Sequence, residues 1–181
     1  KVILVSAARG GAPPQFDGLG AMVHDKVRQE MRAVLADPIP CPFIDRDAQA
    51  LLDEARKTFN ALGLGERYVV ESGGKCYLIS WLGDYANDAL RLLLNHVGLS
   101  CDNAGLAIEV DANIHRTLAA LKDVGDLDAN DLDSILADVE NMLREKWDWA
   151  LPEPLLMKSF ASISLDISTA IGFAQNLTLV K

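Results

Sequence analysis

The sequence predicts an α+β protein, with a small sheet packed on helices and a helical C-terminal part. Three observations lead to this class. β-rich runs are confined to residues 2–5 and 68–110, and apolar residues recur at helical spacing in most of the remaining chain. The composition, 50% apolar and 24% charged over 181 residues, is that of a globular domain able to bury one good core or two small ones. The predicted sheet consists of the N-terminal strand and a ββαβ unit.

The first third combines one strand with two helices. Residues 2–5 (VILV) predict the strand, and the glycines and prolines of residues 8–14 (ARGGAPP) exclude regular structure after it. A helix is expected over 21–36, ended by an extended connector that contains Pro38, Pro40 and Pro42. Asp45 is placed to cap a second helix that runs to Leu62.

The middle of the chain predicts the ββαβ unit. Strands are expected at 68–71 and 76–81, joined by the hairpin turn Ser-Gly-Gly-Lys. A helix capped by Asp84 follows to Val97, where Gly98 and Leu99 supply its C-terminal stop, and a strand returns at 106–110.

The C-terminal part predicts four helices, at about 112–122, 131–147, 153–161 and 166–176. The helix over 131–147 has the clearest pattern, with one apolar side made of Leu132, Ile135, Leu136, Val139, Leu143 and Trp147. We therefore expect an α+β accessory domain over 1–111 and a helical, acidic part over 112–181 that packs on the same core.

Charge is distributed unevenly along the chain. The net charge is −9, yet residues 1–36 carry five basic and three acidic side chains, whereas residues 102–153 carry four basic and thirteen acidic ones. The overall sign excludes a strongly basic protein that wraps nucleic acid. A contact with a polyanion would therefore belong to the basic N-terminal face.

Localisation is suggested by what the sequence lacks. No apolar run approaches the roughly 18–20 residues that span a bilayer, so no membrane contact is expected, and no signal peptide opens the chain. The three cysteines have no C-x-x-C spacing, which indicates reduced thiols in a cytoplasmic protein. The first residue is Lys1 rather than Met, so we expect this chain to be a piece of a longer protein.

A stripe of basic residues is the first candidate site. His24, Arg28 and Arg32 follow at spacings of four and share one face of the first helix, and Arg9 and Lys26 lie nearby in sequence. Arg and Lys make most phosphate contacts, so this stripe could bind a nucleic-acid backbone. Alternatively, it is a solvated helix face whose charge is balanced by acidic neighbours on the same helix.

Trp81 is the second candidate, because it stands at the end of a predicted strand. Its ring could stack on a nucleic-acid base, or it could close the edge of a core while Asp84 caps the next helix. No catalytic constellation, nucleotide-binding loop or metal-ligand spacing is found, and the Asp-rich run 123–133 indicates a solvated, helix-capping turn.

Two motifs near the N-terminus resemble a known family. Residues 8–18 (ARGGAPPQFDG) and 23–31 (VHDKVRQEM) are similar to segments in the C-terminal accessory region of bacterial DEAD/DEAH-box ATP-dependent helicases, of superfamily 2. Shorter matches follow in the family's order. They are FID at 43–45, LLDEAR at 51–56, WLGD at 81–84, GLAI at 105–108, KWD at 146–148, LPE at 151–153, LL at 155–156 and LD at 165–166.

The resemblance implies a parent helicase that binds ATP and Mg²⁺ in two motor domains upstream. The motifs of that motor are not in this sequence, so we expect the fragment itself to bear no catalytic residue and to hold no cofactor. Its expected partners are the motor domains and, under the first of the two hypotheses below, DNA or RNA.

Two hypotheses about function follow. In the first, the domain assists nucleic-acid guidance or strand separation through Arg9, His24, Lys26, Arg28 and Arg32, with Trp81 as a stacking residue. In the second, it is a protein-interaction or structural module that docks the motor domains or a partner and has no nucleic-acid contact. Its acidic half, 102–153, would then provide the docking surface.

Overall fold

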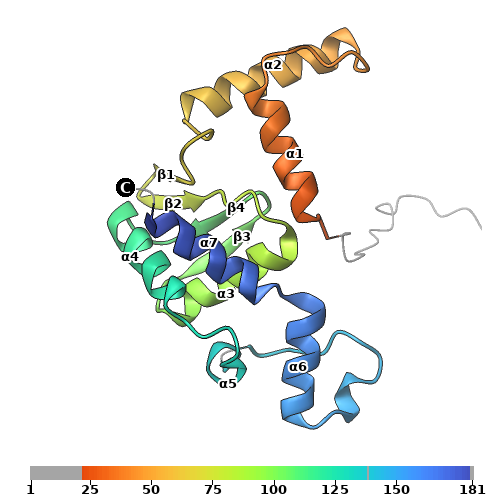
Figure 1. The fold of residues 1–181 in the computed structure, drawn as a ribbon, viewed down its shortest axis with the longest axis vertical. Helices are drawn as coiled ribbons and strands as arrows, with labels where there is room; N and C mark the ends of the chain where they lie inside the picture. The colour runs from red at the N-terminus through yellow and green to blue at the C-terminus, as the bar shows by residue number, and fades with distance from the viewer. Residues whose placement is uncertain (1–21, 138, 180–181) are drawn as a thin grey trace, which may run out of the picture.

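The protein is α+β, and a computed structural model describes residues 22–137 and 139–179. Its sheet has the order β1-β2-β4-β3 and is antiparallel throughout. The strands are β1 (Val69–Ser72), β2 (Lys75–Leu78), β3 (Cys101–Ala104) and β4 (Ala107–Val110) (Figure 1). Along the chain, α3 (Asp84–His96) connects β2 to β3. The strand predicted at residues 2–5 lies outside the described residues.

The sequence predicted one strand after α3, but the structure has a hairpin of two. Gly105, at φ 75°, makes the turn between β3 and β4. β3 was missed because it is a polar edge strand in which only Cys101 is buried, so it has no apolar alternation.

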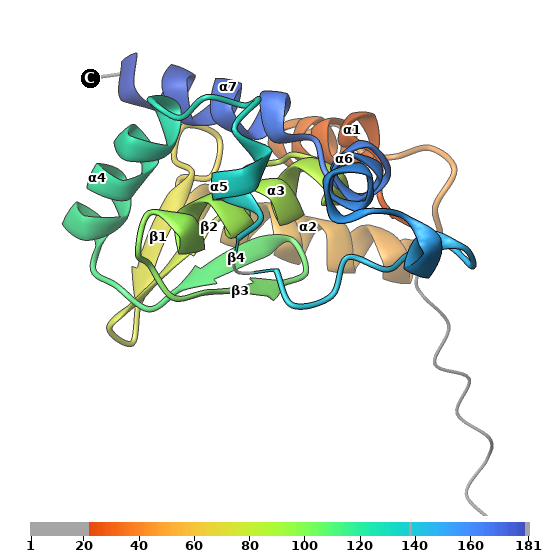
Figure 2. The same ribbon diagram turned by 90° about the horizontal axis from the view of Figure 1, so that it is seen from below.

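The main core lies on one face of the sheet. Alternate residues of β2 and β4 point into it, as expected for an antiparallel sheet with one solvated face. α3 and α4 (Ile114–Gly125) pack on this face, and α7 (Ile167–Leu179) packs against both of these helices (Figure 2). Residue 111 is the predicted boundary between the two parts of the chain. The cluster contains residues from before and after it, from Cys76 to Ala174.

A second, smaller cluster joins the core to two helices at one end of the molecule. It contains Phe59, Leu64, Ile79 and Trp81. The helices are α1 (Asp25–Ala36) and α2 (Arg46–Ala61), and we call residues 25–61 the α1–α2 hairpin (Figure 1). Asp45 accepts a hydrogen bond from the Ala48 N–H at 2.8 Å, which confirms it as the N-cap of α2.

Buried Arg56 connects the two helices of the hairpin. Its guanidinium donates to the carbonyl oxygens of Val34 and Ile39. The Val34 carbonyl is in the last turn of α1 and has no helical partner, so an arginine from α2 satisfies the end of α1.

The prediction of a helix over 131–147 is wrong. Within the described part of this segment, α5 covers only Leu132–Ile135, and a 3₁₀ turn, η1 (Asp148–Ala150), follows it. Polar side chains take over backbone hydrogen bonds in between: Asn141 accepts from Leu143 N–H, and Asp148 accepts from Arg144 and Glu145 N–H. Such local bonds compete with a helix, so the apolar periodicity was misleading. The chain then forms α6 (Glu153–Ser164) and α7, close to the predicted ranges.

Candidate functional site

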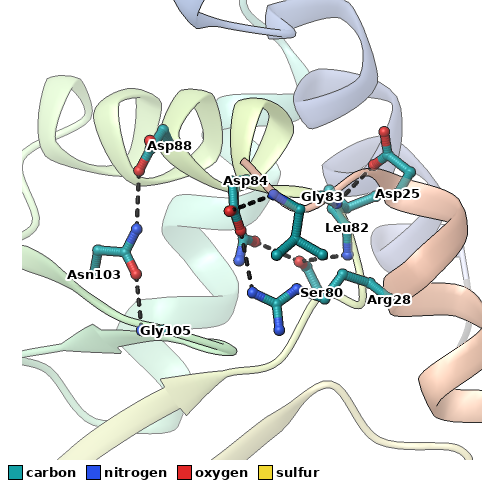
Figure 3. Close-up of polar contacts among 11 residues, drawn as sticks. Asp25, Arg28, Ser80, Leu82, Gly83, Asp84, Asp88, Asn103 and Gly105 are labelled. Carbon is teal, nitrogen blue, oxygen red and sulfur yellow. Dashed lines mark hydrogen bonds and ion pairs between the residues drawn. The ribbon is translucent and has the colours of Figure 1, made fainter. Parts of the chain in front are cut away.

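The candidate residues that the structure describes lie where the start of α1 meets the turn before α3. Asp84 Oδ2 accepts from Val23 N–H at 2.7 Å, and Asp84 N–H donates to the Val23 carbonyl at 2.9 Å. Asp25 Oδ1 accepts from Gly83 N–H at 2.7 Å (Figure 3). Each of the two helices thus supplies one aspartate that satisfies a backbone N–H at the start of the other, where negative charge is also favoured by the helix dipole.

This arrangement corrects the role predicted for Asp84. The N-cap of α3 is Gly83, and Asp84 is the first helical residue. Its carboxylate holds α1 in place instead of capping its own helix. Gly83 is required there, because a Cβ would lie 2.6 Å from Asp25 N and 2.7 Å from the Val23 carbonyl oxygen.

Two arginines of the predicted basic stripe are bound inside the domain. Arg28 donates to Asp84 Oδ1 at 3.1 Å, and both side chains are largely buried. Arg32 donates to the Tyr68 hydroxyl at 3.0 Å and to the Gly65 carbonyl at 2.7 Å, and its guanidinium lies over the Tyr68 ring. These contacts hold α1 against the start of α3 and the loop before β1, so the two arginines are not the free cations that a phosphate contact needs.

The rest of the stripe is exposed or not described. His24 is the N-cap of α1, where its Nδ1 accepts from Lys26 N–H at 3.1 Å. The predicted start of this helix at residue 21 was therefore early. Both His24 and Lys26 are exposed. Arg9 lies outside the described residues.

Trp81 is a core residue. Its side chain is 3% exposed, and its ring packs on Phe59 with centroids 5.9 Å apart. Of the two roles predicted for Trp81, closing the edge of a core agrees with this burial. Stacking on a base does not, because no face of the buried ring is open to a base. Trp81 also has a φ of 60°, a strained value for a bulky residue. The Ser80 hydroxyl, bonded to Asn87 Oδ1 at 2.5 Å and to Leu82 N–H, helps to fix this turn (Figure 3).

A pair of exposed tryptophans was missed by the sequence analysis. Trp147 and Trp149 are 64% and 69% exposed, with ring centroids 6.3 Å apart. The Lys146 ammonium lies 4.8 Å from the centroid of Trp147. The spacing W-D-W could have revealed them, since residues two apart cannot share one helix face.

The turn that carries these tryptophans is ordered by one buried carboxylate. Asp148 Oδ2 accepts from the backbone N–H groups of Arg144 and Glu145, each at 2.8 Å. These hydrogen bonds, with the nearby Arg144 charge, hold the pKa of Asp148 below its usual range. We call residues 144–149 the tryptophan turn.

A groove of about 1040 Å³ lies near this turn. It is bounded by α3, α5, α6 and residues 139–145, and its lining mixes apolar side chains with both signs of charge. His96 in its wall lies 3.4 Å from the Ser134 hydroxyl.

One cysteine among the described residues has a shifted pKa. Burial raises the pKa of the Cys101 thiol to about 11, so it stays protonated at neutral pH. In the part of the chain that is described, no three His, Cys, Asp or Glu side chains gather as a metal site would require. Nor does any helix there have the length and apolar character to cross a bilayer.

Comparison with models of known protein families, with curated proteins and with solved structures finds no match for this chain. Its function is therefore argued from its own residues and from the motifs in its sequence.

Proposed function

We propose that this chain is a non-catalytic accessory domain of a cytoplasmic, bacterial DEAD/DEAH-box ATP-dependent helicase, and that it serves as a docking module for the motor domains. The resemblance of residues 8–18 and 23–31 to that family supports the assignment to a helicase. ATP and Mg²⁺ would bind to the motor domains.

The observation that carries the docking role is the apolar surface of the α1–α2 hairpin. α1 contains no fully buried residue, and Val27, Met31 and Val34 form an exposed stripe along it. Phe43, in the connector to α2, is 86% exposed. An aromatic residue and an apolar helix stripe left open to water on a protruding element are typical of a protein-binding surface (Figure 1).

Internal pairing of the arginines favours docking over phosphate binding on this helix. Arg28 and Arg32, the two arginines of the stripe on α1, are bound to Asp84, Tyr68 and Gly65. Releasing them to bind phosphate would break the contacts that hold α1 in place. Nucleic-acid guidance remains a second candidate function, favoured by a different feature, the exposed tryptophan pair.

The test is association of this chain with separately produced motor domains of the parent helicase, followed by calorimetry. Val27→Asp and Met31→Asp should each weaken binding at least about tenfold, because a charge placed in an apolar interface must be desolvated. Leu155→Asp, on α6 at the other end of the molecule, is the matched control, since Leu155 is as exposed as Val27. Equal loss in all three variants, or no association of the unaltered chain, would refute the docking role.

A further inference from the structure

The tryptophan turn, residues 144–149, presents two exposed aromatic rings, and the packing of the fold does not account for their exposure. Tryptophan has the largest apolar side chain, and its exposure to water is costly unless the ring is covered by a ligand. Trp81 is buried in this protein, whereas Trp147 and Trp149 are each about two-thirds exposed. The two rings are therefore available for contact, and neither contributes to the core.

The turn is built to hold the rings in place before anything binds. Asp148 stands between the two tryptophans in the sequence, and its side chain is buried. It accepts two hydrogen bonds from the backbone N–H groups of Arg144 and Glu145, which fix the path of the chain. The Arg144 guanidinium adds a contact over the Phe160 ring, 4.8 Å from its centroid, which ties the turn to α6. Ordered rings lose little conformational entropy on binding.

One cation lies beside the exposed rings. The Lys146 ammonium is in contact with Trp147, whereas the Arg144 guanidinium is bound internally, where it donates to the carbonyl oxygens of Asn141 and Leu143. The Asp148 carboxylate is buried, with its charge stabilised by backbone N–H groups, so it is not a surface anion. Glu145 is the exposed acidic residue within the turn.

We propose that the tryptophan turn binds single-stranded nucleic acid, with bases stacked on Trp147 and Trp149 and a backbone phosphate near Lys146. Aromatic rings beside cations are the usual means by which proteins hold single strands without reading their sequence. The two exposed rings lie 6.3 Å apart, so bases can stack on them, and Lys146 supplies the phosphate contact. This site is independent of docking through the α1–α2 hairpin, which lies at the opposite end of the molecule (Figure 1).

Intrinsic fluorescence gives a direct test, because the chain has three tryptophans and the buried one is an internal reference. Titration with a 12-nucleotide oligo(dT) at low salt should quench the emission of Trp147 and Trp149. A variant with Trp147→Phe and Trp149→Phe keeps only Trp81 as a tryptophan and should show no quenching. Absence of quenching in the unaltered chain at low salt would overturn the proposal.

Affinity measurements by anisotropy of labelled oligo(dT) then assign the roles of the side chains. Trp147→Ala and Trp149→Ala should each weaken binding by about 5- to 150-fold, the range expected when a stacked base loses its ring. Both side chains are exposed, so the variants should keep their fold, and near-ultraviolet circular dichroism checks this. Unchanged affinity in both would place the strand elsewhere and refute the proposal.

The charge variants separate stacking from simple attraction. Lys146→Ala should reduce the salt dependence of binding by about 0.7 in the log–log slope, the value of one phosphate contact on a single strand. Glu145→Gln should tighten binding at low salt, because it removes the exposed anion of the turn. If the tryptophan pair drives self-association instead, sedimentation will show a concentration-dependent dimer lost in the Trp147→Ala variant, and that result would also refute nucleic-acid binding.

Discussion

At Gly83 the turn before α3 touches the backbone that leads into α1. The φ of Gly83 is −69°, so alanine is not excluded by backbone conformation. An added Cβ, however, would lie under 3 Å from backbone atoms of Val23, His24 and Asp25, which have no flexible end that can move away. We expect Gly83→Ala to lower the free energy of unfolding by about 1–3 kcal/mol, as for other cases of overpacking.

Gly172 provides the matched control for this substitution. It lies inside α7, where an added Cβ meets no atom within 4 Å. Alanine there should leave stability unchanged or raise it by about 0.5–1 kcal/mol, because glycine is the poorer helix former. Urea unfolding of both variants makes the comparison, and equal effects would show that Gly83 is not a point of close contact.

Asp148 predicts a pH dependence of the tryptophan turn. Its pKa is lowered in the folded protein by the N–H groups of Glu145 and Arg144, so its ionised form stabilises the fold. This stabilisation is present above the unfolded-state pKa, near 3.9, and is lost as the pH falls through the lower folded pKa. Asp148→Asn keeps the shape but loses the charge. Unfolding measured from pH 7 down to pH 2 should therefore depend less on pH in the variant, and an unchanged profile would contradict the assignment.

At the scale of the element, α1 combines polar contacts with the packing of Leu35 on the smaller cluster. Arg28→Ala removes the guanidinium that binds Asp84 Oδ1 and should cost about 1–3 kcal/mol, since this oxygen of the largely buried carboxylate then loses its partner while Oδ2 keeps the bond from Val23 N–H. Lys26→Ala, two residues away and exposed, should change stability by less than about 0.5 kcal/mol. Urea denaturation compares the two. Similar, small effects would mean that Arg28 is only a solvated residue of the helix face.

Elements with strong local signals were predicted well from the sequence. α2 follows a 3.6-residue apolar pattern and begins at the predicted cap, Asp45. The predicted helix 131–147 had an equally regular pattern, yet its backbone hydrogen bonds go to Asn141 and Asp148. An apolar periodicity shows only where the apolar residues fall. It gives no sign that a polar side chain will accept the backbone hydrogen bonds that a helix needs.

The candidate site was less predictable, because its residues are partnered across long stretches of sequence. The stripe of Arg28 and Arg32 was visible from spacing, but their partners Asp84 and Tyr68 are 56 and 36 residues away. Burial of Trp81 depends in the same way on Phe59 of another helix. Only the tertiary structure distinguishes a cation that holds a helix in place from one that is free to bind phosphate.

For the molecule as a whole, the main core and the α1–α2 hairpin are separable in their contacts. Members of the main cluster run from Cys76 to Ala174, and the hairpin, residues 25–61, contributes none of them. It adds Phe59 to the smaller cluster, together with the polar contacts around Gly83 and Asp84. Opening of the hairpin should therefore cost less free energy than global unfolding.

A shortened chain tests this division. A protein that begins at residue 62 should keep the sheet and α3, α4 and α7, and should unfold cooperatively, because every member of the main cluster remains. Loss of Phe59 would uncover Trp81, so the tryptophan emission should shift to longer wavelength relative to the full chain. In the full chain, amide exchange in α1 should be faster than in α3 or α7. If the shortened chain does not unfold cooperatively, the α1–α2 hairpin is part of the folding unit. The division of the molecule into a core and a separable hairpin would then be wrong.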